Sequence, residues 1–413
     1  MKCLAVNTYD SGGGAARAAY RLHRGLMEIG IESRMLVQDR LGDDPSVIGP
    51  ETGPGKLFSK LRQQLDSIPL RLLGARPEAV WGLSWLPGRW VELIKGLDPD
   101  VIHLHWIGDG FIPVADLPRL NRPVVWTIHD SWPFTGGCHI PFDCTGYRDS
   151  CRDCPQLGPR GRAGMAHWVW KRKHRHWRGL KLTVVAPSRW LAGCAGESSL
   201  FGDVRVEVIP NGLDLRRYRP VDRAAARRLM GLPTDKKIIL FGAMSADRDR
   251  NKGYHLLLPA LRRLAGEGWG QKAELVVFGS MGPAVPEDTG ISTRYAGRLY
   301  DDVSLVLLYS CADALVAPSL QENLPCTVME AMACGTPCVA FDTGGMPDLI
   351  DHMRNGYLAR PYDTEDLASG IDRVMGGVQW EYFSRNAREK VEREFSLDKV
   401  AARYVSLYNE LLR

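Results

Sequence analysis

The sequence contains no apolar run of the roughly 18 residues that a membrane-spanning helix needs. Its first residues, MKCLAVNTYD, turn polar too early for a secretory signal peptide. We also find no repeated unit of the solenoid kind and no low-complexity tract. These absences argue against an integral membrane protein, a repeat protein and a disordered chain, and they predict a cytosolic protein.

The 413 residues are too many for one ordinary hydrophobic core, so two domains of roughly 200 residues each are expected. Apolar residues make up 45% of the chain and charged residues 24%, which is typical of a globular enzyme. The net charge of +5 is uneven, because residues 1–205 hold 27 Lys and Arg against 20 Asp and Glu. The first half is therefore expected to face an anionic partner or surface, unless the excess is ordinary surface charge.

Short apolar runs alternate with helical segments in both halves of the chain. In the first half we expect strands in KCLAVN, ESRMLVQD, DVIHLHW, PVVWTIHD and LTVVAPS. The pattern restarts in the second half with KKIILFGAM, AELVVFGS, ALVAPS and PCVAFDTGG. This alternation predicts an α/β protein with parallel sheets covered by helices on both faces. The expected domains are residues 1–205 and 206–394, with the amphipathic segment 395–413 packing back on the first.

Two glutamates, Glu322 and Glu330, interrupt the mostly apolar segment SLQENLPCTVMEAMACGTPCVAF. The preceding ALVAPS is a strand end, so Glu322 is expected at the carboxyl edge of a sheet, where open α/β sheets bind ligands. Pro325 suits the first turn of a helix that ends at Gly335. Two carboxylates near the free N–H groups of a helix start suit a polyhydroxylated ligand. The alternative is that both glutamates are ordinary solvent-exposed residues.

This segment resembles the signature of the retaining glycosyltransferases of family 4, E-x7-E followed by EAMA-x-G-x-P-V-V-A and a Gly-Gly turn. Here the signature stands as ENLPCTVMEAMACGTPCVAFDTGG, and the resemblance extends to both halves of the chain. It implies the GT-B architecture, with two facing Rossmann-like doubly wound domains and a C-terminal helix that returns to the first. The motif HDSWPFTGGC further resembles glycosyltransferases of colanic-acid-type exopolysaccharide clusters.

The resemblance implies that these residues bind a nucleotide diphosphate sugar. Glu330 is expected to hold the ribose hydroxyls and Glu322 to approach the donor sugar. The loop between them is expected to contact the donor through Asn323, Leu324 and Pro325. Relatives more often carry Gly-Phe or Phe-Gly after the first glutamate, which leaves the identity of the sugar open.

Two glycine turns are expected to approach the donor phosphates. One is Gly344 and Gly345, which open a helix in DTGGMPDLI. The other is Gly13 and Gly14 in DSGGGAARAAYRL, whose equivalent in the family lies over the phosphates at the interdomain cleft. That stretch is not a G-x-G-x-x-G fingerprint, so a dinucleotide site is not expected.

Departure of a diphosphate requires cations or a metal ion to stabilise the growing negative charge. No DxD-type metal site stands out at a strand end, and relatives usually work without one, so no catalytic cofactor is expected. Lys252 fits the family's lysine. The usual arginine is replaced by Ala243, and Arg248 is preferred over Arg250 as its substitute.

His129 ends the strand in PVVWTIHD, and by the resemblance it lies near the donor sugar and the reacting centre. His103 and His105 alternate along the preceding strand, which favours a packing role for both. A lone histidine is more often structural than catalytic, so the position of His129 at a sheet edge is what distinguishes it.

Four cysteines lie within 17 residues, at Cys138, Cys144, Cys151 and Cys154. Cytosolic thiols stay reduced, so disulfides are not expected. Four thiolates ending in C-x2-C can close a tetrahedral structural zinc site, although the first spacing is wider than usual. Such a site would brace the loop that positions His129. Free or redox-active thiols are the alternative.

Residues 160–181 hold eight Lys and Arg, no acidic residue, and three tryptophans, Trp168, Trp170 and Trp177. This composition predicts contact with an anionic membrane surface, whereas a solvated helix with buried tryptophans is the alternative. Nucleic acid is not the expected partner.

Together these features predict a retaining, metal-independent hexosyltransferase of surface polysaccharide synthesis. Its acceptor is expected to be a saccharide or a polyprenyl-diphosphate-linked saccharide, at the cytoplasmic face of the inner membrane. The alternatives are another GT-B enzyme, such as a nucleotide-sugar epimerase or a phosphorylase, and a non-enzymatic membrane or nucleic-acid adaptor. A phosphorylase would need a pyridoxal-binding lysine, which the sequence does not identify.

Overall fold

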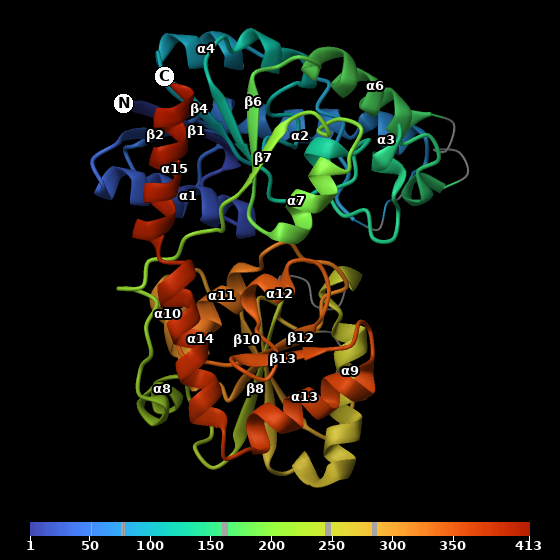
Figure 1. Ribbon diagram of the computed structural model, residues 1–413. Coiled ribbons are helices and arrows are strands. Elements are labelled where there is room, and N and C mark those ends of the chain that lie inside the picture. The colour runs from blue at the N-terminus through green and yellow to red at the C-terminus, as the bar shows by residue number, and fades with distance from the viewer. Residues whose placement is uncertain (51, 76, 78, 159–163, 244–248, 283–286) are drawn as a thin grey trace. The chain divides into compact units, whose positions relative to one another are not determined.

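A computed structural model describes the chain except residues 51, 76, 78, 159–163, 244–248 and 283–286 (Figure 1). The chain forms two compact units. Unit 1 comprises Met1–Gly212 and Leu397–Arg413, and unit 2 comprises Leu213–Ser396. The boundaries expected from the sequence lie seven residues before the first of these divisions and two residues before the second.

The core of unit 1 is a seven-stranded sheet in the order β3-β2-β1-β4-β5-β6-β7, with neighbouring strands parallel. Its strands are β1 (Lys2–Tyr9), β2 (Glu32–Asp39), β3 (Val47–Ile48), β4 (Val101–Leu104), β5 (Val124–Thr127), β6 (Leu182–Ala186) and β7 (Arg205–Val208). Strands β4 and β6 are buried along their whole length, as expected when helices cover both faces.

Alternate residues of these strands enter different hydrophobic clusters. Leu4 and Ile102 belong to one cluster, whereas Cys3 and Val101 belong to another that includes residues of the first and last helices. The α-helices of unit 1 are α1 (Gly14–Glu28), α2 (Gly53–Asp66), α3 (Ile68–Leu72), α4 (Trp90–Gly96), α6 (Met165–Trp177), α7 (Arg189–Gly196) and α15 (Leu397–Leu411). The short 3-10 turns are η1 (Val114–Arg119), η2 (Trp132–Phe134), η3 (Gly146–Arg148) and η4 (Pro155–Leu157).

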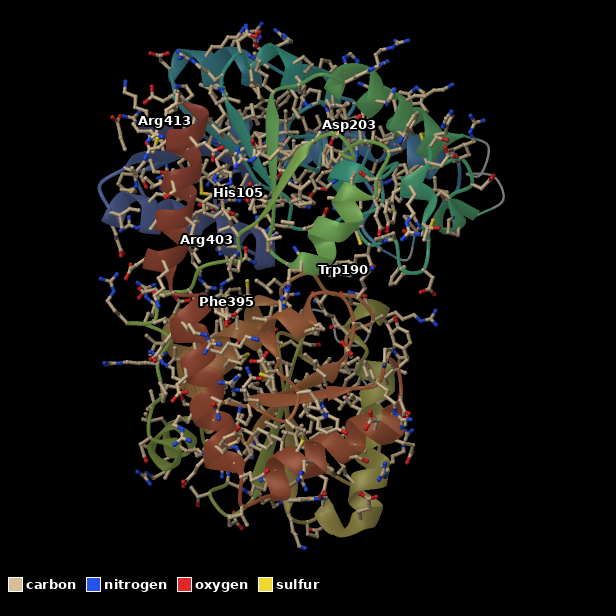
Figure 2. The ribbon with its side chains drawn as sticks, in the orientation of Figure 1. His105, Trp190, Asp203, Phe395, Arg403 and Arg413 are labelled. Atoms are coloured by element: carbon tan, nitrogen blue, oxygen red, sulfur yellow. The ribbon has the colours of Figure 1, made fainter. Side chains whose placement is uncertain are left out.

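The C-terminal helix α15 packs against α1 in unit 1, as the resemblance implied (Figure 1). The hydroxyl of Tyr408 is hydrogen-bonded to Nδ1 of His103 at 2.6 Å, and that of Tyr404 to Oγ1 of Thr127 at 2.8 Å. Arg403, labelled in Figure 2, donates from Nη2 to the carbonyl oxygen of Val208 at 2.5 Å. The last residues of the chain therefore stabilise the sheet that the first residues begin.

Unit 2 contains a six-stranded parallel sheet in the order β10-β9-β8-β11-β12-β13. The strands are β8 (Lys237–Gly242), β9 (Ala273–Phe278), β10 (Ser292–Gly297), β11 (Ala314–Ala317), β12 (Cys338–Phe341) and β13 (Gly356–Ala359). Its sheet also separates two hydrophobic clusters, because Ile238 and Leu240 face one side and Ile239 and Phe241 the other.

The helices of unit 2 are α8 (Arg223–Leu229), α9 (Tyr254–Leu264), α10 (Asp302–Cys311), α11 (Cys326–Ala333), α12 (Met346–Leu349), α13 (Thr364–Gly376) and α14 (Trp380–Glu394). A 3-10 turn, η5 (Arg250–Lys252), precedes α9, and a π-helical segment, η6 (Ala265–Trp269), follows it. Both units are therefore the doubly wound α/β structures that the sequence predicts.

Candidate active site

Two loops that follow adjacent parallel strands meet at the carboxyl edge of the unit 2 sheet. One follows β8 and carries Lys252, and the other follows β11 and carries Glu322. Nζ of Lys252 donates to Oε1 of Glu322 at 2.5 Å. The two side chains remain 34% and 15% exposed, so a ligand can reach the pair. Burial lowers the pKa of Lys252, but the charge and hydrogen bond of Glu322 outweigh it, so the pKa is raised and the ammonium stays charged.

Asn251 joins the same two loops. Its Nδ2 donates to the carbonyl oxygen of Gln321 at 2.9 Å, and its Oδ1 accepts from the backbone N–H of Gln321 at 3.1 Å. Its carbonyl oxygen accepts from the N–H of Leu320 at 2.8 Å. Asn251 thereby holds the Glu322 loop beside Lys252. Sequence reasoning missed this residue, and its place next to Lys252 was the only signal available.

Two glycines permit the close approach of these loops. Gly253 has a φ of +71°, and a Cβ there would lie 1.8 Å from the carbonyl oxygen of Pro318. Gly344 has a φ of +57°, and its Cβ would lie 2.1 Å from the carbonyl oxygen of Glu322. The N–H of Gly345 donates to that same oxygen at 2.9 Å. The close approach at the Gly344–Gly345 turn is therefore to the Glu322 backbone, which explains why glycine stands there without any phosphate.

Glu330 lies on α11 and is fully buried. The hydroxyl of Tyr309, on α10, donates to its Oε2 at 2.7 Å. The carboxylate is therefore closed off from solvent in the free protein, and its contact with a ribose stays a prediction. Tyr309 is a second residue that the sequence pattern did not identify.

The residues of the loop between the glutamates differ in burial. Leu324 is buried and belongs to the same hydrophobic cluster as Val328 and Met329 of α11, and its contact with the donor stays a prediction. Asn323 and Pro325 are partly exposed. Pro325 precedes the first residue of α11 instead of standing in its first turn.

The arginine predicted to stabilise the diphosphate, Arg248, lies outside the described residues. Arg250 lies in η5 and is exposed. Which of the two stabilises the leaving group therefore stays a prediction.

In unit 1, His129 follows β5 and makes a direct contact with His105, which follows β4. Nδ1 of His105 and Nε2 of His129 are hydrogen-bonded at 3.1 Å, with the rings stacked. Burial lowers the pKa of His129 to about 4, partly offset by the charge of Asp130, and burial also holds the pKa of His105 well below its usual range. Both imidazoles are therefore neutral near pH 7, and His105 contacts the candidate site residue directly instead of serving only in packing.

His103 has the buried, hydrogen-bonded environment expected of a packing residue. It is fully buried, and Nε2 is hydrogen-bonded to Oγ1 of Thr127 at 2.7 Å, while Nδ1 contacts Tyr408. Burial, with the nearby His129, lowers the pKa of His103 to about 3.

Asp130 directly follows His129, and its hydrogen bonds hold the loop that follows β5. Oδ2 of Asp130 accepts from Nε1 of Trp106 at 2.7 Å and pairs with Nδ1 of His139 at 2.7 Å. Oδ1 accepts from the N–H of Trp132 at 2.9 Å, and the N–H of Ser131 donates to the carbonyl oxygen of His139 at 3.0 Å. The segment containing His139 thus supports the His129 loop. Sequence reasoning missed Asp130 and His139.

Gly13 and Gly14 stand at the start of α1, beyond the carboxyl end of β1. Gly13 has a φ of +143°, a conformation that favours glycine. A Cβ added at either residue would meet no atom within 4 Å among the described residues, so the turn has space beside it. Their approach to the donor phosphates stays a prediction.

The four cysteines of the predicted zinc site, Cys138, Cys144, Cys151 and Cys154, line one pocket and are free thiols. The N–H of Gly136 donates to Sγ of Cys151 at 3.1 Å, and burial raises the pKa of that thiol to about 11. Within the described parts of the chain, no three His, Cys, Asp or Glu residues are grouped in a way that could hold a metal ion. Zinc binding by these four cysteines therefore stays a prediction.

The basic stretch 160–181 differs from a fully solvated helix. Lys173 is completely buried: Nζ donates to the carbonyl oxygens of Trp132 and Thr135 and lies 3.7 Å from the centroid of the Trp132 ring. Burial lowers the pKa of Lys173 to about 7. This lysine supports the loop that follows Asp130, so it is not a membrane-facing charge.

Two of the three tryptophans of α6 are hydrogen-bonded within unit 1. Nε1 of Trp177 donates to the carbonyl oxygen of Val114 at 2.9 Å, and Nε1 of Trp170 donates to Oγ of Ser199 at 3.0 Å. Trp168 is exposed, with the guanidinium of Arg172 over its ring. Among the helices that the structure describes, none is long and apolar enough to cross a membrane.

Comparison with known families gives two matches that together span most of the chain. Residues 12–217 match the description "Glycosyltransferase Family 4", and residues 235–376 match "Glycosyl transferases group 1".

Two curated relatives show how far the similarity extends. The chain is 26% identical over 434 aligned positions to the "Putative colanic acid biosynthesis glycosyl transferase WcaC" of Escherichia coli K12, and this alignment covers 100% of both chains. It is 32% identical over 221 residues to the "D-inositol 3-phosphate glycosyltransferase" of Saccharomonospora viridis, which covers 50% of each. The chain therefore spans only about half the length of that second relative.

Solved structures share the fold at low sequence identity. Sucrose-phosphate synthase from Thermosynechococcus elongatus superposes with a TM-score of 0.72 at 20% identity, covering 99% of this chain and 98% of that one. Anabaena Alr3699/HepE, solved in complex with UDP-glucose, superposes with a TM-score of 0.63 at 16% identity, covering 99% and 100%. At these identities the similarity establishes the two-domain GT-B fold alone.

Proposed function

Because the chain belongs to glycosyltransferase family 4, we propose that it transfers a hexosyl group, with retention of configuration, from a nucleotide diphosphate sugar to a saccharide. The observation that carries this proposal is the Lys252–Glu322 pair at the carboxyl edge of the unit 2 sheet. It stands where parallel α/β sheets bind ligands, and it is built from the residue types that a diphosphate and a sugar require.

Each member of the pair has a separate task in the proposed reaction. The ammonium of Lys252 stabilises the negative charge that grows on the departing diphosphate. The carboxylate of Glu322 accepts hydrogen bonds from hydroxyls of the donor sugar. In the free enzyme each charge neutralises the other, so both side chains are held in place before the donor binds. Arg248 is the proposed second cation.

We propose further donor contacts for other residues that the sequence predicts. Glu330 binds the ribose hydroxyls, and the turns at Gly13–Gly14 and Gly344–Gly345 border the phosphates. The neutral imidazole of His129 donates or accepts one hydrogen bond at the donor sugar without adding a charge. The departing phosphate takes the proton of the acceptor hydroxyl on the same face of the sugar, so the reaction needs neither a protein base nor a catalytic metal ion.

The biological setting is proposed from the relatives. The colanic acid name of the Escherichia coli relative favours a surface polysaccharide as the product. The UDP-glucose complex of the Anabaena protein makes UDP-sugars the first donors to test. We place the enzyme in the cytoplasm, with an acceptor that is either a saccharide or a polyprenyl-diphosphate-linked saccharide at an anionic membrane surface. The four clustered cysteines are the place where a structural zinc ion would bind.

The experiment that tests this proposal is a screen of donors. The purified protein is incubated with UDP-, GDP- and dTDP-sugars and saccharide acceptors, and release of the nucleoside diphosphate is measured. Release is expected with one donor class, to persist after treatment with a chelator, and to give a product whose anomeric configuration, read by NMR, matches the donor. If no donor binds in calorimetry and none is consumed, the proposed function is wrong.

A further inference from the structure

Five large apolar side chains of helix α2 and the short α3 are exposed to solvent. Leu57, Phe58 and Leu61 of α2 are 69%, 58% and 48% exposed, and Ile68 and Leu72 of α3 are 39% and 82% exposed. We call these five side chains the α2–α3 apolar face. Single exposed leucines are ordinary, but five large apolar side chains within sixteen residues are a typical sign of an interaction surface.

The opposite face of α2 is polar and buried, which is the reverse of an ordinary surface helix. Its buried residues are Ser59, Arg62 and Asp66. Oγ of Ser59 donates to the carbonyl oxygen of Gln38 at 2.7 Å. These residues form one helical stripe, so the orientation of α2 is set by hydrogen bonds.

Arg62 and Asp66 bind backbone groups of unit 1. The guanidinium of Arg62 donates to the carbonyl oxygen of Gly110 at 2.8 and 3.0 Å and also reaches those of Leu86 and Pro87. The carboxylate of Asp66 accepts from three consecutive backbone N–H groups, those of residues 83–85, at 3.2–3.3 Å. Turning α2 over would leave a guanidinium and a carboxylate without these partners, which is costlier than exposing three apolar side chains. The apolar face is therefore held outward by the fold.

The exposed charged side chains within the described segment 53–75 have one sign. In residues 53–75 the exposed charged side chains are Lys56, Lys60 and Arg71, whereas the single acid, Asp66, is buried. Leucine and phenylalanine flanked by lysine and arginine are the composition of helices that lie in the interface of an anionic bilayer.

The neighbouring helix adds to the same character. Leu70 of α3 shares a buried cluster with Ala166 and Val169 of α6, and Figure 1 shows α3 beside α6 in unit 1. α6 exposes Trp168 together with Lys171 and Arg175.

We propose that the α2–α3 apolar face docks on an anionic lipid bilayer, with Leu57, Phe58, Leu61, Ile68 and Leu72 inserted at the headgroup level. Lys56, Lys60 and Arg71 then contact the lipid phosphates. This inference deepens the proposed function, because it names the surface through which the enzyme reaches a membrane-bound acceptor. It replaces the basic stretch of α6 as the principal contact, since Lys173 is buried and two of the three tryptophans there bind within unit 1.

The test is co-sedimentation of the full chain with phosphatidylcholine vesicles that contain or lack phosphatidylglycerol. Binding is expected to the anionic vesicles, to fall steeply as salt rises, and to weaken at least about tenfold in the variant Leu57→Gln/Phe58→Gln/Leu61→Gln. The single variant Leu72→Gln, at the most exposed of the five positions, is expected to weaken binding without any effect on folding. Lys56→Gln/Lys60→Gln/Arg71→Gln should remove the salt dependence.

A matched control is Leu229→Gln/Val303→Gln, which changes two similarly exposed apolar residues of unit 2 and should bind as the unchanged protein does. Absence of binding to anionic vesicles, or full binding by both the triple glutamine variant and Leu72→Gln, would overturn the proposal. The proposal would also be overturned if light scattering showed that the unchanged protein is a dimer and the triple variant a monomer, because the face would then bind a second copy of the chain. Nucleoside diphosphate release with a soluble acceptor is measured separately, so a failure of docking is distinguished from a failure of the proposed function.

Discussion

Lys252 and Glu322 are separated by 70 residues in the sequence, and their charged groups lie 2.5 Å apart. The pair forms because β8 and β11 are neighbours in the sheet, so the loops at their carboxyl ends must meet. Asn251 and Gly344 fix that meeting, the first by hydrogen bonds to the Glu322 loop and the second by allowing its backbone to approach. The site is therefore assembled from loop geometry as much as from two charges.

Removing the cation at this site should slow the transfer itself. Lys252→Ala is expected to lower kcat by about 100-fold, the scale of one lost charge stabiliser in a transition state. Nucleoside diphosphate release under saturating donor measures the effect. Lys272→Ala, at an exposed lysine of the same unit, is the control and should retain full activity. Undiminished turnover in Lys252→Ala would mean that another group neutralises the diphosphate.

The buried carboxylate of Glu330 should act on donor affinity. Glu330→Gln is expected to lose charge-assisted hydrogen bonds of about 1.5–3 kcal/mol to the ribose, which is roughly a tenfold to hundredfold weaker Kd in calorimetry. Tyr309→Phe removes the hydroxyl that binds Glu330 but keeps the charge, so it should weaken nucleotide binding less. A variant Glu330→Gln that unfolds at lower temperature yet binds the nucleotide normally would show that the residue is structural.

The ionisation of His129 should not be visible near neutral pH. Because burial lowers its pKa to about 4, kcat/KM is expected to show no titration from this residue between pH 8 and 5. Activity should decline only as the pH approaches 4. His129→Gln should lower turnover, whereas His174→Gln, at an exposed histidine, should not. A titration near pH 6.5 that disappears in His129→Gln would contradict the neutral state of this imidazole.

Lys173 should couple folding stability to alkaline pH. Its pKa is about 7 in the folded protein against 10.5 for an ordinary lysine, so between these values the unfolded chain binds more protons. This contribution therefore raises stability as the pH increases from 7 to 10.5. In Lys173→Met the contribution is absent, while Lys171→Met retains it. Urea unfolding at several pH values measures the difference between the two variants, and identical curves would refute the lowered pKa.

The cysteine cluster gives a prediction about metal content. If Cys138, Cys144, Cys151 and Cys154 bind structural zinc, protein purified without chelators should contain about one zinc per chain by elemental analysis. Cys138→Ser/Cys154→Ser should lose the metal and lower the melting temperature, whereas Cys194→Ser should do neither. Purified protein that contains no zinc, together with a double variant that melts at the same temperature as the unchanged protein, would show that the four thiols are free.

The sequence by itself determined the class of fold and the place of Glu322. Apolar runs of strand length that alternate with helical segments specify parallel α/β units. Hydrophobic periodicity identifies each strand and helix locally. The strand–helix–strand connections are then right-handed in nearly all proteins. Because ALVAPS is predicted to be a strand, Glu322, which follows it, is expected at the carboxyl edge of the sheet. The short or polar strands β3, β7, β10 and β13 were not predicted, because edge strands carry little apolar signal.

Only the tertiary structure decided which side chains meet. His105 contacts His129 because β4 and β5 are adjacent and in register, and no spacing within either strand reveals that pairing. In the sequence Lys173 is one charge of a basic stretch, but in the fold α6 packs it against Trp132. α2 shows the same limit: its two faces are visible in the sequence, but hydrogen bonds from Arg62 and Asp66 to distant backbone decide that the polar face is buried. Burial depends on contacts across the chain, so local pattern cannot determine it.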